Sequence, residues 1–182
     1  MYLEIQWINF RIIMISLLNI FSIPINSKGK ISIVSRPKGN EFLEESIEYL
    51  KQMEIGIVVS ALTNEEEEEL GLTLEGEFCN KYGIEFLKFP MQDRGIPLSI
   101  SDIDKFCRNL ALKVQDGFSI GVHCRASIGR SSILASSIMA HLGFNARDAL
   151  NLISQSRRIK VPDTEIQEAW INEYYAHVSH KP

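Results

Sequence analysis

Short apolar stretches alternate with amphipathic stretches along most of the chain. The short stretches are rich in branched and aromatic residues and predict strands over residues 31–35, 55–62, 84–89 and 118–122. Between them, apolar residues recur at helical spacing, as in 41–53 and 103–114. Strands that alternate with helices favour an α/β fold, with a central, mainly parallel sheet of four to five strands and helices on both faces. Ligands of such sheets gather at the carboxyl ends of the strands.

The helix boundaries follow from capping residues and glycines. Helices are predicted over 41–53 with Asn40 as N-cap, from Thr63 or Asn64 onward, over 73–82, from Ser99 or Ser101 to Gly117, over 130–142, from Asn145 to Ser156, and over 164–177. The second of these helices begins with five consecutive glutamates, Glu65 to Glu69. The positive end of a helix dipole stabilises carboxylates there. We therefore interpret the glutamates as a solvated first turn rather than as a surface for a basic partner.

The composition indicates an ordinary globular protein. The chain has 182 residues, of which 45% are hydrophobic and 23% charged, enough for one domain and hardly for two. Its net charge of −4 provides no basic field, so we expect no nucleic-acid partner. The three cysteines are few and odd in number, so we expect no disulfide scaffold. Free thiols fit a reducing compartment. We expect a cytoplasmic monomer.

Residues 12–25 are mostly apolar, but polar residues and a proline interrupt them. The stretch is shorter than the roughly 20 residues of a membrane-spanning helix, so we expect no membrane span. Glu4 and the absence of a small-x-small cleavage site argue against a signal peptide. We favour a retained hairpin or strand pair over a weak export signal or a loosely packed extension. The predicted organisation is an apolar N-terminal extension over 1–28 and one domain over 29–182.

The most informative segment is residues 123–131, His-Cys-Arg-Ala-Ser-Ile-Gly-Arg-Ser, between a predicted strand and a predicted helix. Successive N–H groups of a tight loop and of a helix N-terminus can converge on a phosphate. The same positive environment would favour the thiolate of Cys124. Arg130 can hold two phosphate oxygens through its planar fork, and Gly129 lets the backbone pass close to the ligand. The segment therefore predicts an anion cradle with a nucleophile at its floor.

This H-C-x5-R-S segment resembles the signature of the cysteine-dependent protein phosphatases of the tyrosine and dual-specificity superfamily. Residues 84–97 resemble the general-acid loop of that superfamily, and residues 161–167 its C-terminal segment with a glutamine. Residues 36–39 are similar to an early loop of compact members near the kinase-associated phosphatases. The acid loop precedes the cysteine, an order that favours the dual-specificity branch over the low-molecular-weight tyrosine phosphatases. The resemblance implies a tyrosine phosphatase-like domain.

The resemblance also implies roles for individual residues. Cys124 would attack phosphorus and form a phosphocysteine, Arg130 would stabilise the transferring phosphoryl group, and Asp93 would protonate the leaving oxygen. Ser131 would donate a hydrogen bond to the departing thiolate. The remaining assignments are substrate binding by the loop residues Arg125, Ala126, Ser127, Ile128 and Gly129, orientation of the loop by His123 through backbone bonds, and positioning of water by Gln167. The mechanism needs no metal and no other cofactor.

Four further residues need separate treatment. Asp102 and Asp104 are rivals of Asp93, but both fall at a predicted helix start, where a carboxylate is simply stabilising. Many superfamily members have glycine where this chain has Ser127. If the backbone there is unusual, serine carries strain, and Ser127→Gly should keep or raise activity. For Arg94, contact with substrate and simple solvation are left open.

The function implied is a protein phosphatase that acts on phosphotyrosine, with phosphoserine and phosphothreonine as further substrates, in a phosphorylated protein partner. A phosphoinositide phosphatase or an RNA 5′-phosphate phosphatase is the second reading. A pseudophosphatase that binds phosphorylated partners without turnover is the third, and Ser127 keeps it open. Cys79 and Cys107 fall on helix faces and are expected in the core, with Cys79 as a less favoured partner for oxidised Cys124.

Overall fold

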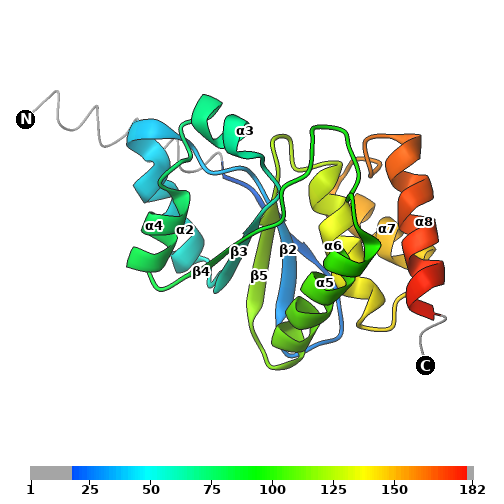
Figure 1. The fold of residues 1–182 in the computed structure, drawn as a ribbon. Helices are drawn as coiled ribbons and strands as arrows, with labels where there is room; N and C mark the ends of the chain where they lie inside the picture. The colour runs from blue at the N-terminus through cyan, green and yellow to red at the C-terminus, as the bar shows by residue number, and fades with distance from the viewer. Residues whose placement is uncertain (1–17, 180–182) are drawn as a thin grey trace, which may run out of the picture.

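The computed structural model describes residues 18–179. Within them, a single five-stranded sheet has the order β1-β2-β5-β3-β4 (Figure 1). The strands are β1 (Ile20–Ile23), β2 (Lys30–Val34), β3 (Ile57–Ser60), β4 (Glu85–Lys88) and β5 (Ser119–His123). β2, β5, β3 and β4 run parallel, and only β1 is antiparallel to its neighbour. The predicted α/β class and the mainly parallel sheet are confirmed.

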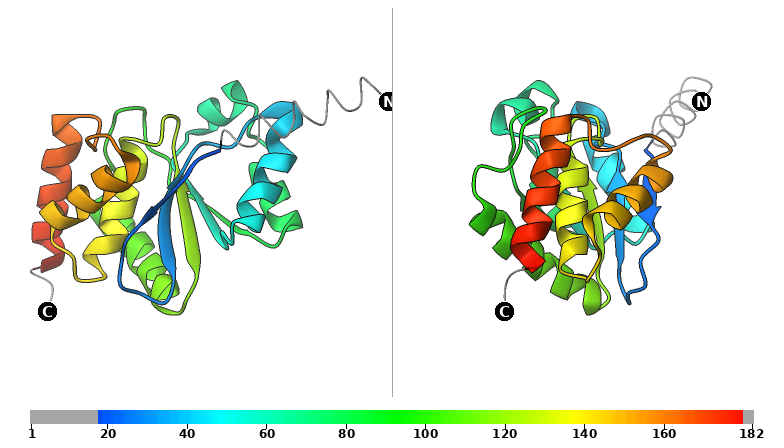
Figure 2. Two further views of the ribbon diagram at one scale, coloured as in Figure 1. Left: turned by 180° about the vertical axis from the view of Figure 1, so that it is seen from behind. Right: turned by 90° about the vertical axis from the view of Figure 1, so that its right-hand side faces the viewer.

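Helices cover both faces of this sheet, as Figures 1 and 2 show. The helical elements are the 3₁₀ turn η1 (Asn40–Phe42), α2 (Leu43–Gln52), α3 (Asn64–Glu69), α4 (Glu75–Lys81), α5 (Ile100–Gln115), α6 (Arg130–Ala140), α7 (Ala146–Arg157) and α8 (Glu165–Ser179). α2 and α4 pack on one face, and α5 to α8 lie on the other. Each face therefore has its own hydrophobic core.

The strand β3 shows how one short sequence serves both cores. Ile57 and Val59 contribute to the core under α5 to α8, whereas Val58 contributes to the core under α2 and α4. Successive side chains of a strand point to opposite faces, so a strand covered on both sides is expected to be mostly apolar. All four residues of β3 are buried, and three of them are apolar. This explains the apolar run Ile57-Val58-Val59 within the strand predicted over 55–62.

Capping side chains begin three of the helices at the predicted places. Thr63 accepts a hydrogen bond from the Glu66 N–H at 3.3 Å, Ser99 from Asp102 at 3.2 Å, and Asn145 from Asp148 at 2.9 Å. The prediction that Asn40 caps a helix is wrong. Asn40 has φ +55° and lies in the short 3₁₀ turn before α2, and its N–H donates to the Gly71 carbonyl instead.

The edge strand β1 lies within the segment assigned to an N-terminal extension. Ile20 pairs with Val34 and Ile23 with Ile31, so a strand pair is present at residues 20–23, as we favoured. The rest of the apolar stretch, residues 12–17, lies outside the described residues. The boundary between an extension over 1–28 and a domain over 29–182 stays a prediction. Among residues 18–179, no helix is both long and apolar enough to cross a membrane.

Candidate active site

The loop of residues 124–129 leaves the carboxyl end of β5, the middle strand of the sheet. Val122 pairs with Ile33 of β2 on one side and with Val59 of β3 on the other. The loop leads directly into α6, every residue of which is buried. No side chain caps the N-terminus of this helix. Its first N–H groups and the positive end of its dipole are therefore directed at the loop, as the cradle prediction requires.

Cys124 lies at the floor of this loop. It is 3% exposed, and its Sγ lies 3.6 Å from the Oγ of Ser131 in the first turn of α6. A hydroxyl at that distance can donate a hydrogen bond to a thiolate. The structure thus places Cys124 beside Ser131, the residue expected to donate a hydrogen bond to its thiolate.

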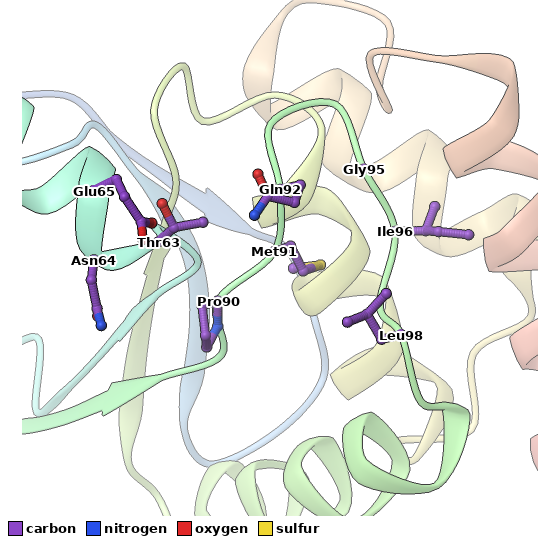
Figure 3. A pocket seen from close by; sticks show the side chains of 9 residues that line it. All are labelled: Thr63, Asn64, Glu65, Pro90, Met91, Gln92, Gly95, Ile96 and Leu98. Carbon is purple, nitrogen blue, oxygen red and sulfur yellow. The ribbon is translucent and has the colours of Figure 1, made fainter.

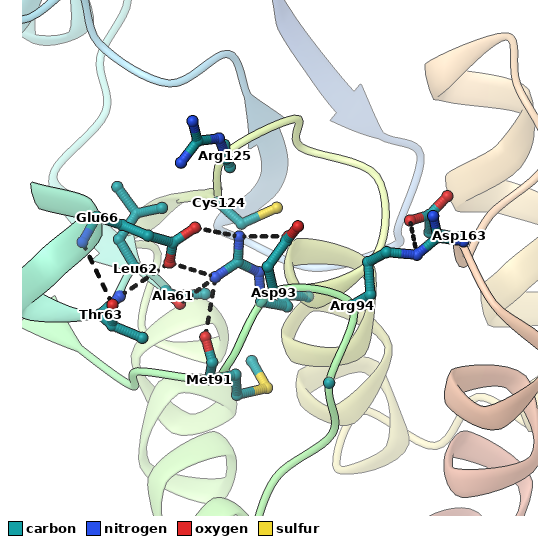
Figure 4. A network of polar contacts seen from close by, with 12 residues as sticks. Ala61, Leu62, Thr63, Glu66, Met91, Asp93, Arg94, Cys124, Arg125 and Asp163 are labelled. Carbon is teal, nitrogen blue, oxygen red and sulfur yellow. Dashed lines mark hydrogen bonds and ion pairs between the residues drawn. The ribbon is translucent and has the colours of Figure 1, made fainter. Parts of the chain in front are cut away.

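Arg130 is 1% exposed and is held by four neighbours, of which the Ala61 carbonyl is the most distant, at 3.5 Å from Nη1 (Figure 4). Its Nη1 and Nη2 donate to the two carboxylate oxygens of Glu66, at 2.6 and 2.8 Å. Nη1 also donates to the Met91 carbonyl at 2.9 Å, and Nη2 to Asp93 Oδ1 at 2.9 Å. Burial on its own would lower the pKa of Arg130, but the hydrogen bond with Glu66 and the surrounding negative charges outweigh it and raise that pKa.

The interpretation of Glu65 to Glu69 as a solvated first turn holds for Glu65, Glu68 and Glu69, which are exposed, but is wrong for the other two. Glu66 and Glu67 are buried, and Glu67 pairs with Lys88 at 2.7 Å. Burial alone would raise the pKa of Glu66, but the hydrogen bonds from Arg130 and from the Thr63 N–H lower it. The capping box of Thr63 and Glu66 fixes the start of α3 and directs the Glu66 carboxylate inward. That T-x-x-E pattern was the one signal in the sequence that distinguished Glu66 from the other glutamates.

The acid loop between β4 and α5 reaches the same place from another side. Asp93 meets Arg130, whereas Asp102 sits in the first turn of α5 and Asp104 is buried against Arg108 at 3.2 Å. Of the three candidate acids, only Asp93 contacts Arg130 among the described residues. Its side chain is 61% exposed, so it can move.

Two contacts connect this loop to the C-terminal part of the chain. Gln167 is buried, and its Nε2 donates to the Gly95 carbonyl at 2.9 Å. Arg94 forms an ion pair with Asp163 at 3.4 Å, a contact that neither of the two readings of Arg94 included.

A cavity of about 30 Å³ lies at the centre of these groups. It is lined by Asp93, Arg94, Cys124, Ala126, Ile128, Gly129, Arg130, Asp163 and Gln167. Asp163 is a member that the sequence gave no reason to include. The volume suffices for about two water molecules.

A second, larger hollow of about 490 Å³ flanks the acid loop (Figure 3). Thr63, Asn64 and Glu65 line it from the start of α3, and Pro90, Met91, Gln92, Gly95, Ile96 and Leu98 line it from the loop. We call it the flanking groove. The side chain of Leu98 is fully exposed at its edge. Met91 joins the groove to the site, because its carbonyl accepts from Arg130.

Ser127 has φ +55°, the left-handed conformation that the sequence raised as a possibility. Its Oγ donates to the Val34 carbonyl at 2.7 Å, and its own carbonyl accepts from Arg157 Nε at 2.9 Å. The Arg157 guanidinium in turn stacks on the Phe21 ring, 4.0 Å from its centroid. β1 and α7 therefore brace the loop at its strained residue.

His123 is enclosed beneath the loop. Its carbonyl accepts from the Ala61 N–H at 3.0 Å, and its Nε2 lies 2.9 Å from Glu75 Oε1 of α4. The backbone bond continues the pairing of β5 with β3, and the side chain contacts a buried carboxylate, so orientation of the loop by His123 stays a prediction. Arg125 points away from Cys124 and pairs with Glu69. Cys79 and Cys107 are buried in the two cores. Among residues 18–179, no three His, Cys, Asp or Glu side chains are grouped so as to hold a metal ion.

Comparisons with known proteins agree with this geometry. Residues 33–143 match the family model described as "Polymorphic toxin system, DSP-PTPase phosphatase". The mouse protein tyrosine phosphatase type IVA 2 is 32% identical over 80 residues, which are 43% of this chain and 47% of that protein. The rat protein of the same name matches equally. The match thus spans about half the length of these curated relatives.

The fold has close counterparts among solved structures. The kinase-associated phosphatase with its catalytic cysteine replaced by serine superimposes with a TM-score of 0.81 at 16% identity, over 91% of this chain and 98% of that one. PTPMT1 gives a TM-score of 0.68 at 19% identity, over 88% and 96% of the two chains. At these identities the likeness concerns the fold. With the family match over more than half of its length, the chain belongs to the DSP-PTPase phosphatase family and so to the superfamily of cysteine-dependent dual-specificity phosphatases.

Proposed function

We propose that this chain hydrolyses phosphotyrosine in phosphorylated proteins through a phosphocysteine intermediate, with phosphoserine and phosphothreonine as further substrates. The observation that carries the proposal is the convergence of Cys124 and Arg130, from the loop after β5 and the start of α6, and of Asp93, from the acid loop, on one small cavity. A nucleophile, a fixed cation and a mobile acid are the groups that phosphoryl transfer from an ester requires.

The contacts of Arg130 suggest how phosphate binds. Glu66 occupies the edge of the guanidinium between Nη1 and Nη2, and Asp93 takes the other hydrogen of Nη2. When Asp93 leaves, Nε and Nη2 present a second edge with two parallel N–H donors. That edge can bind two phosphate oxygens, while Glu66 keeps the guanidinium in place. The loop N–H groups would bind the remaining oxygens.

The chemical steps follow from these positions. The Cys124 thiolate forms a bond to phosphorus as the bond to the tyrosyl oxygen breaks, and Asp93 gives its proton to that oxygen. Asp93, now a carboxylate, takes a proton from a water that attacks the phosphocysteine. Phosphate leaves and the thiolate returns, stabilised by a hydrogen bond from Ser131. Gln167 borders the same cavity, and its contact with Gly95 supports a role in holding the acid loop near the water.

A protein substrate is favoured by the flanking groove. Apolar side chains of the acid loop, Met91 among them, line it together with polar residues at the start of α3. A peptide could place a residue next to its phosphotyrosine there. Three buried free cysteines support a reducing compartment such as the cytoplasm.

A phosphoinositide is the second candidate substrate. A structure of PTPMT1 in complex with PI(5)P has the same fold, with a TM-score of 0.66 at 18% identity. The loop contains a second arginine, Arg125, in addition to Arg130. This extra positive charge favours a substrate that carries a further phosphate or another anion.

The test is hydrolysis of p-nitrophenyl phosphate with EDTA and dithiothreitol present, for the wild type, Cys124→Ser and Asp93→Asn. We expect turnover by the wild type, none by Cys124→Ser, and a loss of about a hundredfold for Asp93→Asn. Phosphotyrosine and phosphothreonine peptides and PI(5)P then rank the substrates. A folded wild type as inactive as Cys124→Ser on every substrate would contradict the proposal and favour a binding protein.

A further inference from the structure

Arg36 and Arg125 have no part in the catalytic steps proposed above. Both follow the carboxyl ends of the neighbouring strands β2 and β5. Ile33 of β2 pairs with Val122 of β5, and Arg36 and Arg125 each follow their paired residue by three positions. Adjacent strands are about 4.8 Å apart, so the two segments leave the sheet side by side. The Ser127 hydroxyl ties them together through the Val34 carbonyl.

Arg125 shows what this place can hold. Its Nη1 and Nη2 donate to the two oxygens of Glu69, at 2.8 and 2.5 Å. The Arg125 and Glu69 side chains are 38% and 58% exposed, so the pair is open to exchange with solvent. The end of α3 that carries Glu69 is fixed against the segment after Arg36, because the Asn40 N–H donates to the Gly71 carbonyl at 2.9 Å. A carboxylate that accepts hydrogen bonds from both terminal nitrogens of an arginine occupies the position that two phosphate oxygens would take.

Arg36 adds a second, unsatisfied cation. Its Nε is buried and has no hydrogen-bond partner among the described residues. Burial and then the charge of Arg125 lower its pKa, while Glu75 and Glu69 act in the opposite direction. Glu75 already faces His123. The acidic neighbours that act on Arg36 are therefore the buried Glu75 and the exposed Glu69, and Glu69 is already held by Arg125. A buried donor without a partner is costly unless a ligand supplies an acceptor.

We propose that Arg36 and Arg125 form a second anion-binding position beside the Cys124 loop, which accepts a second phosphate of the substrate. Glu69 occupies this position in the free protein. A phosphate carries up to two charges and three acceptor oxygens against the single charge of Glu69, so it can displace the carboxylate. The inference rests on the proposed function and narrows its substrate class to molecules with two phosphates.

The spacing between the two phosphates is limited. Arg125 directly follows Cys124, so their Cα atoms are about 3.8 Å apart. The second phosphate must lie within about one arginine side chain of the first. A phosphotyrosine with a phosphothreonine one or two residues away meets this requirement, and so does a vicinal inositol bisphosphate.

Binding to the Cys124→Ser protein, measured by calorimetry, tests the proposal without turnover. The probes are a phosphotyrosine peptide, the same peptide with a nearby phosphothreonine, inositol monophosphate and a vicinal inositol bisphosphate. We expect the second phosphate to tighten binding at least tenfold in one of the two pairs. Arg36→Gln should remove most of that gain, and Glu69→Gln should increase it by about threefold. The pair that shows the gain identifies the source of the second phosphate.

Lys30→Gln is the matched control. It also removes one positive charge, but Lys30 begins β2 at the opposite end of the sheet, where it pairs with Glu54. An equal gain in the parent, Arg36→Gln and Lys30→Gln proteins would overturn the proposal, as would a gain below twofold in both pairs. Glu69→Gln is expected to increase the affinity gained from the second phosphate, whereas Arg36→Gln is expected to decrease it. General destabilisation of the protein would not produce these opposite changes.

Failure of this inference and failure of the proposed function remain distinguishable. A wild type without turnover that still shows Arg36-dependent binding would refute the enzyme and keep the second site. Normal hydrolysis of p-nitrophenyl phosphate without any Arg36-dependent gain would keep the enzyme and refute the second site. We expect Arg36→Gln in the active protein to hydrolyse p-nitrophenyl phosphate within twofold of the wild type.

Discussion

Replacing Ser127 by glycine and, in parallel, by alanine separates two opposing contributions to the stability of the loop of residues 124–129. The Ser127 backbone has φ +55° and its side chain is 2% exposed. An L side chain in this left-handed conformation costs about 1–2 kcal/mol, and glycine adopts it freely. The hydroxyl compensates by donating to the Val34 carbonyl at 2.7 Å.

Both substitutions lose the hydrogen bond of the hydroxyl, but they differ in their effect on the backbone strain. Both remove the hydroxyl and leave the buried Val34 carbonyl without this donor, which costs about 1–3 kcal/mol. Only glycine also releases the 1–2 kcal/mol of backbone strain, in exchange for about 0.4–1 kcal/mol of extra freedom in the unfolded chain. The glycine variant should therefore be the more stable by up to about 1.5 kcal/mol. At a position with negative φ, the alanine variant would be the more stable of the two.

Urea unfolding of the three proteins measures this difference, with the free energy of unfolding extrapolated to water. Activity on p-nitrophenyl phosphate should be kept or raised in Ser127→Gly. An alanine variant more stable than the glycine variant would refute the strain argument. A tenfold loss of kcat/KM in Ser127→Gly would show that the hydroxyl itself supports the loop.

The other predictions concern the partners of the loop. Glu66→Gln leaves the buried Arg130 without its bidentate carboxylate, so we expect a loss of stability on the order of 3 kcal/mol and a lower kcat. Because the folded protein lowers the pKa of Glu66, its stabilisation is present above the unfolded value near pH 4.3 and is lost as the pH falls through the folded value. The unfolding free energies of wild type and variant in urea should therefore converge as the pH falls below the unfolded value. Gly129→Ala would place Cβ 2.6 Å from Gln167 Oε1, so kcat should fall about tenfold, and adding Gln167→Ala should restore part of it in a double-mutant cycle. Asp163→Asn breaks only an exposed ion pair, so its melting temperature should stay within about one degree of the wild type while KM reports any role in the cavity.

Local patterns were sufficient for most secondary structure. Thr63, Ser99 and Asn145 begin helices because a side-chain oxygen satisfies an N–H group within three residues, which is a purely local event. The apolar runs are strands because both faces of the sheet are covered. Asn40 deviates because the Gly71 carbonyl, far along the chain, takes its N–H.

Long-range contacts decided the surroundings of the site. The position of Asp93 beside Arg130 was predicted as a role but not as a contact, because nothing in the loop sequence specifies its path over α6. Glu66 was missed because burial of a carboxylate depends on a partner 64 residues later in the chain. The pairing of Arg125 with Glu69 has the same origin, since it joins residues 56 positions apart.

The sequence by itself determined the motif on which the proposed chemistry rests: an apolar strand, the nine residues 123–131 and a helix are contiguous, and their interactions are local. Only the tertiary structure decided what surrounds that motif. The strand order brings β2 and α3 to the edge of β5, and with them Glu66, Glu69 and Arg36. Charged side chains are placed by whichever partners packing brings within reach, and no periodic pattern in the chain records those partners.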